Sequence, residues 1–207
     1  QPLMVFASAA MGIAGLLAWS GRRRDGTFAS HWYGVAGLVL LPWALTAAQV
    51  SLLWFPMRGV LQAVAAAWYT EAVIFLWLTP LSLACACYLA AKLVGRALPS
   101  YEAAPLAFWM LIVVGTWSAG RHLVGGPVPA WIPTMAVFSF SMLLYHFAVV
   151  GLNLRPVFGL SGSVGSALKF GVGSYLLYGA VAFLACFRGI ALRTQFTHFA
   201  SATEQLF

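Results

Sequence analysis

The sequence predicts an all-α fold, a polytopic bundle of about six helices that cross a lipid bilayer. Three observations predict it. Hydrophobic residues make up 62% of the chain and charged residues only 7%, whereas a soluble domain has about 25% charged residues. Short polar segments, which hold most of the charges, separate apolar stretches long enough to span the hydrocarbon core. Many aromatic residues lie near the ends of these stretches, where amphipathic rings favour the headgroup layer.

The apolar stretches follow one another without a soluble domain or an internal repeat, so residues 1–207 are expected to form a single transmembrane domain. The expected spans cover residues 2–19, 32–55, 61–91, 104–119, 131–152 and 170–191. As a helix, the third would measure roughly 46 Å, so it must tilt, protrude or bend, and Thr79–Pro80 is the expected kink. The chain starts at Gln1 without a signal-peptide pattern, so we expect either a processed protein or the visible part of a longer one.

Basic residues predict the orientation, because they favour the cytoplasmic side of a membrane. The first, third and fifth loops hold Arg22, Arg23, Arg24, Lys92, Arg96, Arg155 and Lys169, and the opposite side holds Arg58, Arg121, Arg188 and Arg193. We therefore expect these three loops in the cytoplasm and both termini outside. The net charge of +7 is then explained by topology and by contact with anionic lipids, and we expect no nucleic-acid partner.

Ionisable residues within or beside membrane spans are the first candidates for function. Glu71 lies in the outer part of the third span, and Arg121 and His122 lie at the outer end of the fourth. The C-terminal tail holds Thr203 and Gln205 on the same side. The predicted topology therefore places all five residues at one membrane depth.

These residues also have purely structural interpretations. Glu71 could form a structural ion pair with Arg121, or Arg121 and His122 could extend to the lipid headgroups. We expect His31 at the interface and His146 in a hydrogen bond to a neighbour rather than as a ligand. The chain has four histidines, and no two of them are four residues apart on one helix, so a metal site has little support.

The three cysteines lie inside apolar stretches at Cys85, Cys87 and Cys186. Cys85 and Cys87 point to different faces of a helix, which does not suit a shared disulfide or metal. We expect all three to be small buried thiols.

Three groups of residues form motifs. The first comprises residues 59–63 (GVLQA), 67–72 (AWYTEA), 76–81 (LWLTPL), 95–96 and 100–101; the second, residues 108–109 and 121–131 (RHLVGGPVPAW); the third, residues 194–199 (TQFTHF). Together they resemble the catalytic subunit (subunit I) of heme–copper oxidases, specifically the C-family or cbb3 type. The resemblance covers most of the chain from residue 59 onward, and the first two spans match only loosely.

The resemblance implies a degenerate member that lacks most metal ligands. The family has a copper-ligand histidine at the position of Glu71 and a His-His copper pair at Arg121–His122. Its heme-ligand His-x-His motif falls on Thr203 and Gln205, which are not usual heme ligands. We therefore expect neither heme nor copper, no catalytic residue and no metal ligand, and regard these five positions as a vestigial site. Our hypothesis is that Glu71 and Arg121 form a charge-paired plug in the vacated copper site.

The resemblance therefore favours a non-catalytic subunit in a bacterial inner membrane, with a structural or docking role in a respiratory or photosynthetic electron-transfer complex. Its partners would be other membrane subunits, among them cytochrome c-type subunits, and lipids. The alternative is an active cbb3-type cytochrome c oxidase or nitric oxide reductase with unusual ligands, in which Glu71 and His122 would serve a metal. A transporter or proton path is a third interpretation, but the charges gather at one depth instead of crossing the bilayer. A family subunit has about twice as many spans. The resemblance therefore leaves open whether this chain is part of a longer protein.

Overall fold

A computed structural model of the chain describes residues 2–21, 28–54 and 57–196, with residues 187–196 described as backbone only. The described residues form helices and turns, with no strand among them. Six helical stretches are long and apolar enough to cross a membrane: Leu3–Ser20, Ala29–Trp54, Val60–Val94, Tyr101–Leu123, Trp131–Gly159 and Ser163–Cys186. The predicted all-α bundle with six candidate spans is confirmed at this level.

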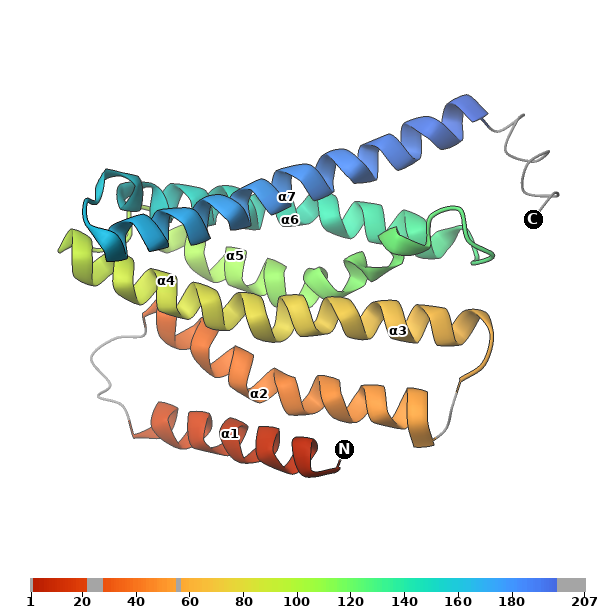
Figure 1. Ribbon diagram of the computed structural model, residues 1–207, viewed down its shortest axis with the longest axis horizontal. Coiled ribbons are helices and arrows are strands. Elements are labelled where there is room, and N and C mark those ends of the chain that lie inside the picture. Colours follow the sequence, from red (N-terminus) through yellow and green to blue (C-terminus); the bar gives the residue numbers. More distant parts are fainter. Residues whose placement is uncertain (1, 22–27, 55–56, 197–207) are drawn as a thin grey trace.

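Several spans combine α-helix with short 3₁₀ or π segments, which we label η; Figure 1 labels the α-helices. In chain order the elements are α1 (Pro2–Ser20), α2 (Ala29–Gln49), η1 (Val50–Trp54), α3 (Val60–Ala72), η2 (Val73–Leu78), α4 (Thr79–Val94), η3 (Tyr101–Ala103), α5 (Ala104–Trp109), η4 (Met110–Val114), η5 (Gly115–Leu123), α6 (Trp131–Leu154), η6 (Arg155–Gly159) and α7 (Ser163–Phe196).

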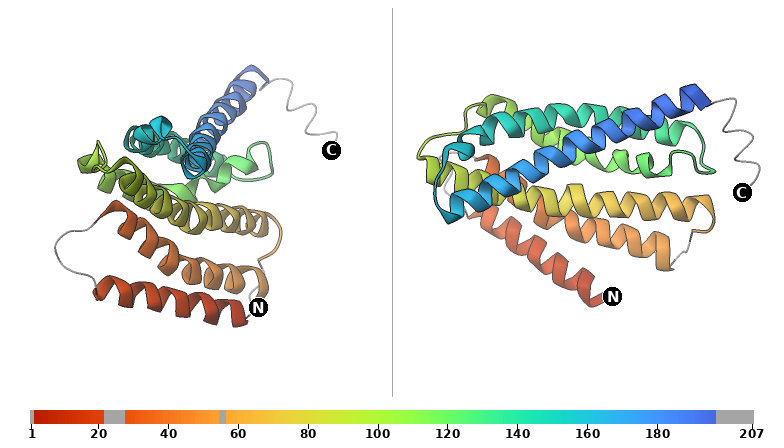
Figure 2. Two further views of the ribbon diagram at one scale, coloured as in Figure 1. Left: turned by 60° about the vertical axis from the view of Figure 1, so that its left-hand side comes forward. Right: turned by 45° about the horizontal axis from the view of Figure 1, so that its top comes forward.

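The spans run up and down, and each packs beside its neighbour in the chain (Figures 1 and 2). α1 packs on α2, α2 on α4, η5 on α3 and α6, and α7 on α6. The loops at residues 95–100 and 160–162 lie at one end of the bundle, and the loop at 124–130 lies at the other (Figure 1). This alternation agrees with the predicted topology, and the side of the membrane that each end faces stays a prediction.

The third span is a continuous helix from Val60 to Val94 in which η2 is a π-helical segment. Proline has no backbone N–H, so Pro80 cannot complete the regular pattern of helical hydrogen bonds. Directly before it, the Thr79 N–H bonds to the Ile74 carbonyl, five residues back. The irregularity expected at Thr79–Pro80 therefore lies mainly in the turn that precedes this pair.

The fourth span runs to Leu123, beyond the expected end at Ala119. Its last segment, η5, lies against α6 so closely that a Cβ on Gly120 would come within 2.8 Å of the Ile132 carbonyl oxygen. The polar residues Arg121 and His122 predicted that the fourth span ends before them. The structure instead continues the helix, because Arg121 binds a buried carboxylate instead of extending to the headgroups.

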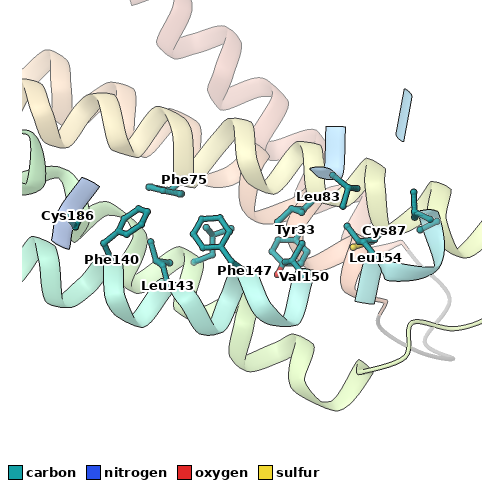
Figure 3. Packing of buried hydrophobic residues seen from close by; sticks show 14 residues of the cluster. Tyr33, Phe75, Leu83, Cys87, Phe140, Leu143, Phe147, Val150, Leu154 and Cys186 are labelled. Atoms are coloured by element: carbon teal, nitrogen blue, oxygen red, sulfur yellow. The ribbon is translucent and has the colours of Figure 1, made fainter. Parts of the chain in front are cut away.

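The main core lies between η2, α4, η4, α6 and α7, and Figure 3 shows its aromatic centre. Phe75, Phe140 and Leu143 are fully buried, and Phe147 is 6% exposed. Within a bilayer the lipid tails are as apolar as these side chains, so van der Waals packing stabilises the contact more than removal from water does. This core lies directly beside the polar cluster described next, because the ring centre of Phe140, a core residue, lies 4.9 Å from the guanidinium carbon of Arg121.

Candidate functional site

Glu71 lies in the last turn of α3 and is completely buried. A lone carboxylate in an apolar environment is very costly, so it requires partners. The Oε1 atom of Glu71 lies 2.7 Å from Nη2 of Arg121 and 2.8 Å from Nε2 of His122. The ion pair hypothesised from the sequence is therefore present, and the alternative in which Arg121 extends to the headgroups is wrong.

The local geometry of η5 lets two consecutive residues reach one oxygen. In a 3₁₀-helix, consecutive side chains are about 120° apart and residues three apart eclipse each other. Arg121 and His122 therefore approach Glu71 from two directions. The side chain of Arg121 is only 9% exposed, whereas that of His122 is 54% exposed. The Glu71–Arg121 ion pair is therefore buried, and His122 lies on its exposed side.

Three further side chains complete the surroundings of Arg121, and sequence reasoning did not find them. Arg121 Nη1 donates to Ser118 Oγ at 3.1 Å, and Nη2 donates to the Tyr178 hydroxyl at 2.9 Å. The guanidinium carbon lies 4.9 Å from the centre of the Phe140 ring, a cation–π distance. We name Glu71, Ser118, Arg121, His122 and Tyr178 the Glu71 cluster.

The missed residues left only weak traces in the sequence. Ser118 precedes Arg121 by three residues, which becomes meaningful only once the segment is known to be a 3₁₀-helix. Tyr178 places a hydroxyl in the middle of an apolar stretch, but nothing in the chain order links α7 to η5. The Glu71 cluster therefore connects three spans that are remote in sequence, through α3, η5 and α7.

The donor set of the cluster does not fit a copper ion. Copper favours several imidazole nitrogens, and here one imidazole, His122, directly contacts the carboxylate oxygen of Glu71. The other group on that oxygen is the Arg121 guanidinium, which has donors and no lone pair to offer a metal. Across the described residues, no three His, Cys, Asp or Glu side chains gather in a way that could hold a metal.

His146 on α6 is fully buried away from this cluster. Its Nδ1 donates to the Ala107 carbonyl oxygen at 2.7 Å, so the other nitrogen accepts from the Tyr175 hydroxyl, 2.8 Å away. Both ring nitrogens thus have partners, and the expectation of a hydrogen-bonded histidine is confirmed. His31 is exposed in the first turn of α2, and its ring makes a tilted contact with Phe28 at 5.8 Å between ring centres.

The expectation for the cysteines is wrong at one position. Cys87 and Cys186 are buried and free, but Cys85 is exposed on α4. Residues two apart on an α-helix lie about 200° apart around its axis, so only one of the two neighbours can face the core. The remaining vestigial positions, Thr203 and Gln205, lie outside the described residues.

Comparison with protein-family models gives no match for this chain, and comparison with curated proteins gives none either. The class that the fold defines is an all-helical protein with six helices able to span a membrane, which indicates a multi-pass membrane protein. Within that class, the particular feature of this chain is the buried Glu71 cluster at one end of the bundle.

Proposed function

We propose that this chain is a non-catalytic integral membrane subunit with the scaffold of a heme–copper oxidase subunit I of the cbb3 type. In this proposal it lies in a bacterial inner membrane and stabilises or docks other subunits, among them cytochrome c-type subunits, in a respiratory or photosynthetic electron-transfer complex. The resemblance in the motifs from residue 59 onward supports the scaffold.

One observation carries the proposal. Arg121 stands at the position of one metal ligand of the family, and it forms an ion pair with Glu71, which stands at the position of another. The family motif has copper-ligand histidines at Glu71 and Arg121, and these two side chains meet at 2.7 Å. A guanidinium supplies the positive charge that a buried carboxylate would otherwise receive from a metal. The pair therefore replaces the metal as a structural element.

The buried groups of the cluster also find their hydrogen-bond partners within the described bundle. The buried polar side chains Glu71, Ser118 and Arg121 are satisfied by one another and by the Tyr178 hydroxyl. A fully satisfied polar network stabilises and specifies a helix arrangement. This supports a structural role for α3, η5 and α7, since each supplies at least one member.

The test is an absorption spectrum of the purified protein, with any subunits that accompany it, before and after reduction with dithionite. We expect His122→Ala, which removes the imidazole of the cluster, to leave every Soret and α band unchanged. We also expect the copper and iron content of the preparation to stay the same in this variant. The matched control is His31→Ala, at the far end of the bundle. A heme band or bound metal lost in His122→Ala alone would favour the active oxidase or nitric oxide reductase instead.

A further inference from the structure

The loop end of the bundle opposite the Glu71 cluster has a pocket of about 760 Å³. It lies between the end of α4, the following loop and η6, and it is lined by Leu93, Val94, Arg96, Pro99, Ser100, Leu152, Arg155, Pro156, Gly159 and Leu160. The two arginines are its charged residues, and both are exposed. Within the described part of the chain, neither guanidinium has a hydrogen bond or an ion pair, in contrast to Arg121.

The walls of this pocket are fixed by a buried clamp. Asn153, 5% exposed, accepts from the Ser100 N–H at 2.7 Å and donates from Nδ2 to the Ser100 carbonyl at 3.3 Å. Gly95, with φ of +72°, ends α4 in the left-handed conformation and turns the chain so that Arg96 follows directly. The clamp and the turn hold Arg96 on one wall and Arg155 on the other.

A separate apolar groove of about 460 Å³ lies next to this pocket, along α4 and α7. Two helices contribute to both hollows: on α4, Leu89 lines the groove and Leu93 lines the pocket one turn later, and on α6, Leu154 lines the groove directly before Arg155 of the pocket. η6 packs against both α4 and α7, as Figure 1 shows at the end of the bundle. A cationic pocket at the end of the bundle therefore lies beside an apolar groove in the membrane-spanning region.

We propose that this site binds an anionic glycerophospholipid, with its phosphate between Arg96 and Arg155 and an acyl chain in the α4–α7 groove. Guanidinium groups pair with phosphate oxygens through two parallel hydrogen bonds, so two unpaired arginines suit this headgroup. The positive-inside rule places this end in the cytoplasm, where anionic lipids attract basic residues. The neighbouring apolar groove favours a lipid over a free phosphate or an acidic protein segment. The inference does not depend on the proposed function.

The first test is a native mass spectrometry titration of the full chain, purified in mild detergent with any accompanying subunits. Dioleoyl phosphatidylglycerol and dioleoyl phosphatidylcholine share acyl chains and phosphate but differ in net charge. We expect phosphatidylglycerol to bind more tightly, and the variant Arg96→Gln/Arg155→Gln to weaken its binding by roughly 30-fold. Arg58→Gln, exposed at the other end of the bundle, is the control and should leave binding unchanged.

The groove is tested by Gly171→Leu, which would fill it, and its control is Gly173→Leu on the same helix. Gly171 lines the groove and Gly173 does not, and a Cβ on either one meets nothing within 4 Å. We expect only Gly171→Leu to weaken lipid binding, by about tenfold or more. This variant keeps the inference testable if the double arginine variant does not fold.

Three results would overturn the assignment. Equal binding of the two lipids by the wild type would show that charge plays no part. Glycerol 3-phosphate that competes with phosphatidylglycerol at similar concentration would make this a site for soluble phosphate. Loss of an accompanying subunit in the double variant, with lipid binding intact, would make the pocket a docking site for an acidic protein segment.

Discussion

Glu71 of α3 and Arg121 of η5 form an ion pair, with 2.7 Å between Oε1 and Nη2, in which the carboxylate is completely buried and the arginine side chain is 9% exposed. His122 reaches the same oxygen from the more open side at 2.8 Å. One carboxylate oxygen thus accepts from two neighbouring residues, while the other lies 3.4 Å from Ser118 Oγ. This asymmetry makes Glu71 the centre of the cluster and the first residue to test.

Glu71→Gln should lower the free energy of unfolding by about 3–5 kcal/mol, because it leaves the buried Arg121 cation without its counter-charge. SDS-induced unfolding in mixed micelles measures this change. Glu102→Gln, which alters an exposed carboxylate, is the control and should stay within about 0.5 kcal/mol of the wild type. A Glu71→Gln protein as stable as the wild type would contradict the charge-paired plug.

Combining Glu71→Met with Arg121→Met should be less destabilising than the sum of the two single substitutions. Each single variant leaves one buried charge unpaired, whereas the double variant leaves none. We expect a coupling free energy of about 1–3 kcal/mol in a double-mutant cycle of unfolding measurements. Additive effects would mean that the two side chains are stabilised independently, and the short distance between them would then have no energetic role.

Tyr175→Phe should destabilise the bundle by about 1–3 kcal/mol, because it removes the donor to the buried Nε2 of His146 and leaves that nitrogen unsatisfied. Tyr88→Phe makes the same chemical change on an exposed ring that packs under Lys92. That control should have little effect in the same unfolding assay. Equal effects of both substitutions would argue against the buried hydrogen bond.

Gly120→Ala should destabilise the protein by about 1–3 kcal/mol, because its new methyl group would push against the backbone of α6 at Ile132. Gly173→Ala, on an open face of α7, should instead be neutral or slightly stabilising, since alanine favours helix. The thermal stability of the two variants in detergent gives the comparison. If Gly120→Ala is the more stable protein, η5 does not pack on α6 as closely as described.

The topology can be tested with single cysteines on a background in which Cys85, Cys87 and Cys186 are alanine. Ala97→Cys and Ser161→Cys should be protected from a membrane-impermeant maleimide in intact cells and should react after the cells are opened. Ala130→Cys lies directly before the start of α6 and should react in intact cells. The reverse pattern would place the lipid pocket on the outer side.

The ion pair changes the number of free basic residues on the predicted outer side, and the predicted orientation depends on that number. Arg121 was counted as a basic residue of the outer side, yet its charge is neutralised by Glu71 inside the bundle. Without it, the outer side has fewer free cations, so the bias toward cytoplasmic odd-numbered loops becomes stronger. The same observation explains why the fourth span seemed to end at Ala119, since a paired arginine can remain inside a span.

The sequence by itself determined the class of fold. The length and spacing of its apolar stretches match the thickness of the hydrocarbon core, in which the backbone must form its hydrogen bonds internally. It also led to Glu71, Arg121 and His122, since charges inside spans are conspicuous. Only the tertiary structure decided that Ser118 and Tyr178 complete the cluster, that Cys85 is exposed, and that a cationic pocket lies beside an apolar groove. These features depend on which helix faces meet. In a membrane, close packing and interhelical hydrogen bonds determine which helices associate, and both depend on residues from two or more segments.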